Sequence, residues 1–178
     1  MSNYNSKESP FFVVEDKPIP LGVLAGERLG RLLDYWSRRR RKAALPIGAC
    51  IDPVELGEHL TRLHILDVQG PSQFRYLLYG TKVTNPDLAD MTGKLTTDYR
   101  DKAFGNLVTT HLTECVDKAQ PVCREIIAVK SGLPYAYRRL VLPWSTDGVR
   151  VSKLMVSPHR ILVPEELDRS VGKGEFAR

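Results

Sequence analysis

The stretch from Phe74 to Gly80 alternates as a half-buried strand does, and it ends at a glycine. The stretch from Arg62 to Val68 has the same character, and the turn-forming run Gln-Gly-Pro-Ser at 69–72 separates the two. Three more strands are predicted later in the chain, separated by hairpin signals at Ser131-Gly132 and at Thr146-Asp-Gly148. These later strands run from Val122 to Val129, from Tyr135 to Pro143 and from Val149 to Ser157.

The segment between the second and third predicted strands is helical. A short helix is expected to begin near Asn85-Pro86 and to end by Gly93. A longer helix is predicted from an apolar stripe of period 3.6, made of Phe104, Leu107, Val108, His111, Leu112, Cys115 and Val116. The predicted fold is therefore α+β, a five-stranded antiparallel sheet with this helical insert covering one face and enclosing a small cavity.

Two helices are predicted before the first strand. An amphipathic helix ends near Lys42, and its apolar stripe consists of Leu29, Leu32, Leu33 and Trp36. A short second helix begins at Asp52, which can cap it, with Pro53 at the first helical position and Glu55 at capping-box spacing.

Several short motifs occur in a fixed order along this framework. They are Leu45-Pro, Ile51-Asp-Pro, Leu66-Asp-Val, Phe74-Arg-Tyr-Leu-Leu-Tyr-Gly-Thr, Met91-Thr-Gly-Lys and Arg139-Leu-Val-Leu-Pro-Trp-Ser-Thr-Asp-Gly. In this order and spacing, residues 29–163 resemble the single-domain PAS proteins common in alphaproteobacteria. The chain departs from that pattern at Leu77, where the family usually has Arg, and at Trp144, where it has Leu. The resemblance implies a PAS-like fold and a sensory or regulatory module, not an enzyme.

Composition predicts one domain with two tails. Residues 1–20 are expected to form a flexible N-terminal arm with an apolar patch at Phe11 to Val14, residues 21–163 the PAS-like domain, and residues 164–178 a charged C-terminal tail. No apolar run reaches the ~20 residues of a membrane span, and no signal peptide is present, so a cytoplasmic location is expected. Cys50, Cys115 and Cys123 lack metal or disulfide spacing and are expected to be reduced, mostly buried thiols.

Other candidate sites each have a simpler structural explanation. His111 and Cys115, four residues apart on one helix, could ligate a metal or haem, but both lie in the apolar stripe and no other ligands are paired with them. No metal site and no group of catalytic residues is predicted. Ser145 and Asp147 are interpreted as turn residues, because the sequence around them lacks the Gly-x-Ser-x-Gly pattern of a nucleophilic serine. The basic run Arg38 to Lys42 could bind an anion or form a solvated helix end; without a nucleic-acid-binding pattern, no nucleic-acid partner is expected.

The prediction of ligand-binding residues depends on which face of each strand lines the cavity. Tyr76, Leu78 and Gly80 are expected on one strand face, with Arg75, Leu77 and Tyr79 on the other, although a one-residue slip would exchange the faces. The candidate lining residues are Tyr76, Leu78, Phe104, Leu107, His111, Tyr137 and Arg139. The sequence does not identify a cofactor or a ligand.

Two functional hypotheses follow. The first is a stand-alone sensory PAS domain that binds a small molecule or a partner protein and signals by association, with a homodimer formed through Leu29, Leu32, Leu33 and Trp36. The alternative is a small-molecule enzyme or carrier that uses the same cavity. An enzyme would need Asp67 or His111 as its acid or base.

Overall fold

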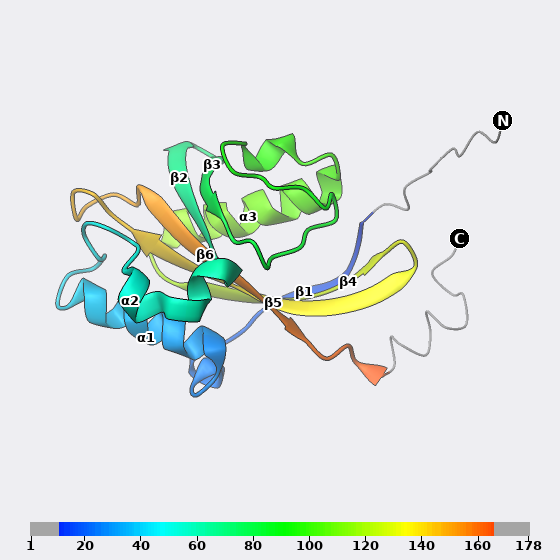
Figure 1. Cartoon of the computed structure of the whole chain (residues 1–178), viewed down its shortest axis with the longest axis horizontal. Coiled ribbons are helices and arrows are strands. Elements are labelled where there is room, and N and C mark those ends of the chain that lie inside the picture. Colours follow the sequence, from blue (N-terminus) through cyan, green and yellow to red (C-terminus); the bar gives the residue numbers. More distant parts are fainter. Residues whose placement is uncertain (1–10, 166–178) are drawn as a thin grey trace.

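The computed structural model describes residues 11–165, which fold around a six-stranded antiparallel sheet (Figure 1). The strands lie in the order β1-β4-β5-β6-β2-β3, so β2 pairs with the last strand, β6, while β1 and β3 lie at the two edges of the sheet. Their bounds are Phe12–Pro18 (β1), His64–Gly70 (β2), Gln73–Tyr79 (β3), Val122–Lys130 (β4), Leu133–Trp144 (β5) and Lys153–Ile161 (β6).

The prediction of five strands is wrong, because part of the expected N-terminal arm is a strand. β1 pairs with β4 along the edge of the sheet, and Phe11, 3% exposed, packs its ring edge-on against Phe104 with the centroids 5.2 Å apart. Proline, which had suggested an arm, is tolerated at the end of an edge strand, where Pro18 stands. Residues 1–10 of the arm and 166–178 of the expected tail lie outside the described residues.

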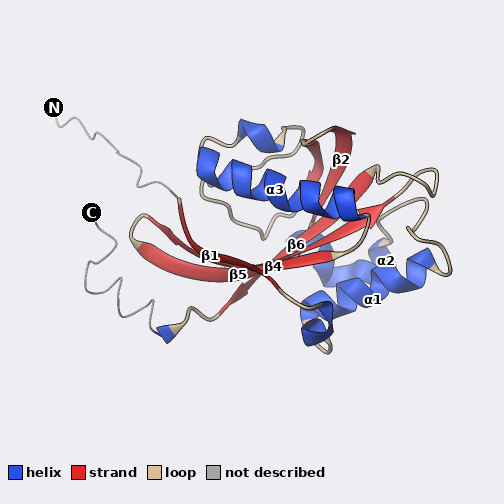
Figure 2. Ribbon diagram, turned by 180° about the vertical axis from the view of Figure 1, so that it is seen from behind, coloured by secondary structure: helices blue, strands red, loops and turns tan. Residues whose placement is uncertain are grey.

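Helices cover both faces of the sheet (Figure 2). The helix α1 (Arg28–Arg40) and the short α2 (Pro53–Leu56) lie on one face, and α3 (Lys102–Lys118) lies on the other. Short 3₁₀ helices occupy Leu21–Leu24, Gly57–Arg62 and Thr96–Asp98. The predicted cap of α2 is confirmed: the Asp52 carboxylate accepts hydrogen bonds from the backbone N–H groups of Val54 and Glu55. None of the helices within residues 11–165 has the length and apolar character of a membrane span.

The predicted helix between Asn85 and Gly93 is wrong; the segment is an irregular loop. The Asn85 side-chain oxygen accepts from the backbone N–H groups of Asp87 and Ala89, and its amide nitrogen donates to the Ala89 carbonyl oxygen. These local bonds compete with helical ones. Leu88 adopts a left-handed φ of 51°, which interrupts any helical path.

The apolar stripe of α1 is buried within a single chain. Leu29, Leu32 and Trp36 are at most 5% exposed and pack with residues of the sheet such as Leu140, while the indole N–H of Trp36 donates to the Pro143 carbonyl oxygen at 2.6 Å. Of the residues predicted to form a dimer interface, only Leu33 is half-buried. The other three are not available to a second copy in this conformation, so a dimer through this stripe stays a prediction.

The basic run at the end of α1 is partly neutralised within the chain. Arg38 and Arg39 pair with Glu55, and Arg39 also reaches Asp52 at 2.6 Å. Arg40 lies over the Trp36 ring, 5.3 Å from its centroid. The ion pairs of Arg38 and Arg39 connect α1 to α2 and its N-cap residue, whereas the contact of Arg40 lies within α1.

A β-bulge in β3 overturns the predicted strand faces. Leu66 pairs with Tyr76 and Ile65 with Leu78, so Leu77 is an extra residue with no partner of its own. Because of this extra residue, Tyr76 and Tyr79 lie on the same face as α3, whereas Leu78 packs with the core beneath α1.

Candidate functional site

A cavity of about 730 Å³ lies between the sheet and the segment that connects β3 to α3, and it extends to the β4–β5 hairpin. Its walls come from the strands β2, β3, β5 and β6, from the insert and from α3, and they include several aromatic rings. The aromatic lining residues are Tyr76, Tyr79, Tyr99, Phe104, Tyr135 and Tyr137. A cavity of this size and character is typical of a small-molecule site.

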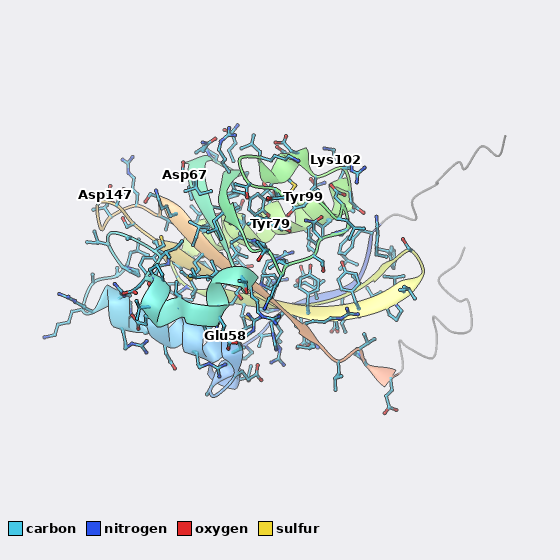
Figure 3. All side chains as sticks on the ribbon, in the orientation of Figure 1. Glu58, Asp67, Tyr79, Tyr99, Lys102 and Asp147 are labelled. Atoms are coloured by element: carbon cyan, nitrogen blue, oxygen red, sulfur yellow. The ribbon has the colours of Figure 1, made fainter. Side chains whose placement is uncertain are left out.

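Three tyrosine hydroxyl groups meet at one wall of this cavity. The Tyr99 hydroxyl lies 3.0 Å from that of Tyr76 and 3.4 Å from that of Tyr79, and the Asn85 amide donates to Tyr79 at 2.8 Å. Figure 3 labels Tyr79 on β3 and Tyr99 on the insert. Burial raises the pKa of each of these phenols, so they remain protonated.

Gly105 in α3 allows Tyr99 to reach this position. A Cβ atom at Gly105 would lie 2.9 Å from the Thr96 carbonyl oxygen and 3.2 Å from the Tyr99 Cβ. The missing side chain therefore lets α3 pack closely against the turn that carries Tyr99.

His64 on β2 is stacked on the Tyr79 ring, with the centroids 3.9 Å apart. Burial, and secondarily the charge of Arg139, lowers the pKa of His64 to about 3, so the imidazole is neutral. Its Nδ1 accepts the Gly80 backbone N–H at 3.3 Å, which places the imidazole proton on Nε2.

Arg139 on β5 is a cavity residue that is only 3% exposed. Its guanidinium donates to Nδ1 of His111 at 2.7 Å and to the Tyr137 hydroxyl at 3.0 Å, and it lies over the rings of Phe104 and Tyr137. Behind the cavity wall, His111 Nε2 lies 2.9 Å from the carboxylate of Asp16 on β1. Burial and the charge of Arg139 lower the pKa of His111 to about 4, although Asp16 acts in the opposite direction.

The charged side chains around the cavity are all basic. No Asp or Glu lines it among the described residues, whereas Arg139 lies inside and the exposed Arg62, Lys82 and Arg160 stand at its mouth. Arg28 and Lys130 complete the set of cations, and of these Lys130 pairs with Asp101 at 2.9 Å. The cavity therefore favours a ligand with negative charge.

The structure brings together part of the predicted ligand site. Tyr76, Phe104, Tyr137 and Arg139 line the cavity; Leu78, Leu107 and His111 do not. Leu78 was misplaced because of the bulge at Leu77, and His111 lies behind Arg139. The cavity is also lined by four residues that were not among the predicted ones: His64, Tyr79, Tyr99 and Tyr135. Tyr135 alternates with Tyr137 on β5, so the period of that strand could have identified it.

The groups considered for catalysis or metal binding lie elsewhere. Asp67 does not line the cavity and lies 3.5 Å from Lys153. Ser145 and Asp147 are turn residues as predicted: the Ser145 hydroxyl donates to Asp147, and backbone N–H groups hold the pKa of Asp147 down to about 2. Within residues 11–165, no cluster of at least three metal-ligating side chains occurs. All three cysteines are free and buried, as predicted.

Comparison with known proteins identifies the family. Among solved structures, the PAS domain of Bordetella pertussis BvgS matches this chain with 16% sequence identity and a TM-score of 0.47, over 70% of this chain and 94% of that one. No curated protein gives a match. The family model described as PAS domain matches residues 25–153, which are most of the chain. The chain therefore belongs to the PAS domain family.

Proposed function

We propose that this chain is a sensory or regulatory PAS domain in which the cavity beside α3 binds a small molecule. PAS domains are in general sensory modules, which agrees with this role. The single observation that carries the proposal is the cavity itself, which has an aromatic lining and a few converging polar groups around about 730 Å³ of space.

The output of such a module is association with a partner protein or with a second copy of the chain. Because the α1 stripe is already buried, an association surface must lie elsewhere or include Leu33, its half-buried member. The proposal also places the protein in the cytoplasm, where the three buried thiols would stay reduced.

The proposal is tested by reducing the cavity without changing the surface. Val108 is 4% exposed and lines the cavity, so Val108→Phe adds volume there. Val54, 94% exposed on α2, offers the same substitution away from the cavity as a control. Native mass spectrometry of the purified protein should show a retained small molecule in the wild type and in Val54→Phe, and should show its loss in Val108→Phe.

Circular dichroism should confirm that both variants are folded. The proposal fails if the wild type retains no small molecule and none of a broad set of metabolites raises its melting temperature. It also fails if a folded Val108→Phe protein binds the same molecule as tightly as the wild type does.

A further inference from the structure

We propose that the ligand of this cavity is a carboxylate with an aromatic or apolar body, and that its carboxylate group lies against Arg139. This inference rests on the proposed function, because it specifies the chemical class of the small molecule. It is carried by a buried cation without an anionic partner and by the hydrogen-bond donors that surround it.

The charge of Arg139 is not compensated by any carboxylate among the described residues. Its partners, the His111 imidazole and the Tyr137 hydroxyl, are both neutral acceptors. Asp16, the nearest acid in this network, is engaged by Arg124 at 3.0 Å and by the N–H of His111. A buried, unpaired cation is costly, and a bound anion would offset that cost.

The geometry of the network also leaves donors of Arg139 unused. A guanidinium has five N–H donors, and the interactions within the chain use one at each terminal nitrogen. Because His111 can only accept from Arg139 through Nδ1, it donates through Nε2 to Asp16, so the arrangement has a single proton assignment. The remaining guanidinium donors match the two oxygens of a carboxylate.

The tyrosine hydroxyls add further unused donors. In the cluster of Tyr76, Tyr79 and Tyr99, two hydroxyl–hydroxyl contacts use two of the three O–H protons, and the Asn85 amide supplies its own proton. One O–H therefore has no acceptor within the described chain. Tyr137 accepts from Arg139, and its own proton also has no acceptor there.

His64 contributes a donor of the same kind. Its proton lies on Nε2, since Nδ1 accepts from the Gly80 backbone, and no acceptor for that proton exists within residues 11–165. A carboxylate accepts hydrogen bonds and donates none, so it suits a cavity in which the unsatisfied polar groups are donors.

The rest of the lining defines the body of the ligand. The rings of Phe104 and Tyr135 and the side chains of Val108 and Leu112 provide apolar contacts. At the mouth, Leu88 and Leu133 are 85% and 70% exposed beside the basic residues. An aromatic acid can place its ring among these groups while its carboxylate reaches Arg139.

The test compares acids with their neutral amides on the full chain. The probes are indole-3-acetate and 2-naphthylacetate, each paired with its primary amide of nearly the same shape, and binding is measured by isothermal titration calorimetry. The acids should bind the wild type about tenfold or more tightly than the amides, because a charge-assisted hydrogen bond is replaced by a weaker neutral one.

Two substitutions of Arg139 test whether its charge causes the tighter binding of the acids. Arg139→Gln should remove the preference for the acids, and Arg139→Lys should retain part of it. Arg62→Gln, at the exposed mouth, is the matched control and should change acid binding only by a small, salt-dependent factor.

Equal binding of acids and amides by the wild type would overturn the carboxylate assignment and leave small-molecule binding intact. A folded Arg139→Gln protein that still binds the acids more tightly than the amides would also overturn the carboxylate assignment. If neither acid binds, the carboxylate assignment fails as well. The proposed function is tested separately, by whether native mass spectrometry finds a retained small molecule in the purified protein. The wild-type comparison stands even if the Arg139 variants do not fold.

Discussion

Arg139 on β5 donates a hydrogen bond of 2.7 Å to Nδ1 of His111 on α3, and this bond joins a cavity wall to the helix that covers it. His111 continues the connection to Asp16 on β1 at 2.9 Å. Burial alone would raise the pKa of Asp16, but the hydrogen bonds from Arg124 and His111 outweigh it, so the pKa is lowered. The edge strand β1 therefore belongs to the same polar network as the cavity.

The residues at the start of β1 predict different effects for adjacent phenylalanines, of which Phe11 directly precedes the strand and Phe12 begins it. Phe11→Ala should lower the free energy of unfolding by about 3 to 5 kcal/mol, because its buried ring packs against Phe104. Phe12→Ala, at a position 53% exposed, should change it by less than ~0.5 kcal/mol. Urea denaturation of both variants measures the difference. Equal effects would contradict the burial of Phe11 against Phe104.

The tyrosine cluster predicts a cost for a single hydroxyl group. Tyr99→Phe should destabilise the protein by about 1 to 3 kcal/mol, because the hydroxyls of Tyr76 and Tyr79 both lose a partner in a buried site. Tyr135→Phe is the control, since its hydroxyl makes no hydrogen bond within the described chain, and it should be nearly neutral. Chemical denaturation distinguishes the two; a neutral Tyr99→Phe would contradict the cluster.

Buried histidines predict that stability falls in acid. The pKa of His64 is lowered from about 6.5 to about 3 by burial, so between these values the unfolded chain binds a proton that the folded chain does not. The stabilisation is fully present above about pH 6.5 and is lost as the pH falls, at up to ~1.4 kcal/mol per pH unit for each such histidine. His111 acts in the same direction down to about pH 4.

Denaturation midpoints measured between pH 7 and pH 4 test this slope. His64→Gln, which keeps a side-chain acceptor, should show a shallower dependence than the wild type. His159→Gln, at a half-buried position, should change the slope less. A wild-type stability that does not vary over this range would contradict a buried neutral His64.

The position of α1 changes how a homodimer should be tested. Leu32→Ala should destabilise the single chain by about 2 to 5 kcal/mol, since Leu32 is 1% exposed beneath the sheet. Leu33→Glu, at the half-buried position, should preserve the strand content and dissociate a dimer that uses this helix. Chemical denaturation measures the effect of Leu32→Ala, and sedimentation at roughly tens of micromolar measures the dissociation expected for Leu33→Glu. An unmodified protein that is monomeric at that concentration would contradict the dimer.

The sequence predicted those elements whose pattern is uninterrupted. The apolar stripe of α3 continues over several turns, and Asp52-Pro53 combines a cap with a favoured first residue, so both helices were found. Tyr137 and Arg139 both line the cavity, as expected of alternate residues on the regular strand β5. In each of these cases local spacing determines which side chains face the core.

The strand β1, the loop at 85–93 and the position of Tyr99 depend on contacts that cannot be deduced from the spacing of residues along the chain. Phe12–Pro18 becomes a strand only because β4 provides a pairing edge, more than one hundred residues away. The loop at 85–93 follows the hydrogen bonds of Asn85 and not its proline signal. Tyr99 has no periodic neighbours on the cavity wall, and its place depends on the close approach allowed by Gly105.

The unpaired Leu77 in β3 has a consequence for aligning this chain with its relatives. In a relative whose strand lacks the bulge, the single-residue gap belongs opposite Leu77, in the middle of the strand. An aligner that favours gaps in turns would shift it toward Gly70 or Gly80, and would then match Tyr76 or Tyr79 with a residue of the opposite face. A comparison of cavity residues across the family therefore requires that the gap opposite Leu77 be placed correctly before side chains are compared.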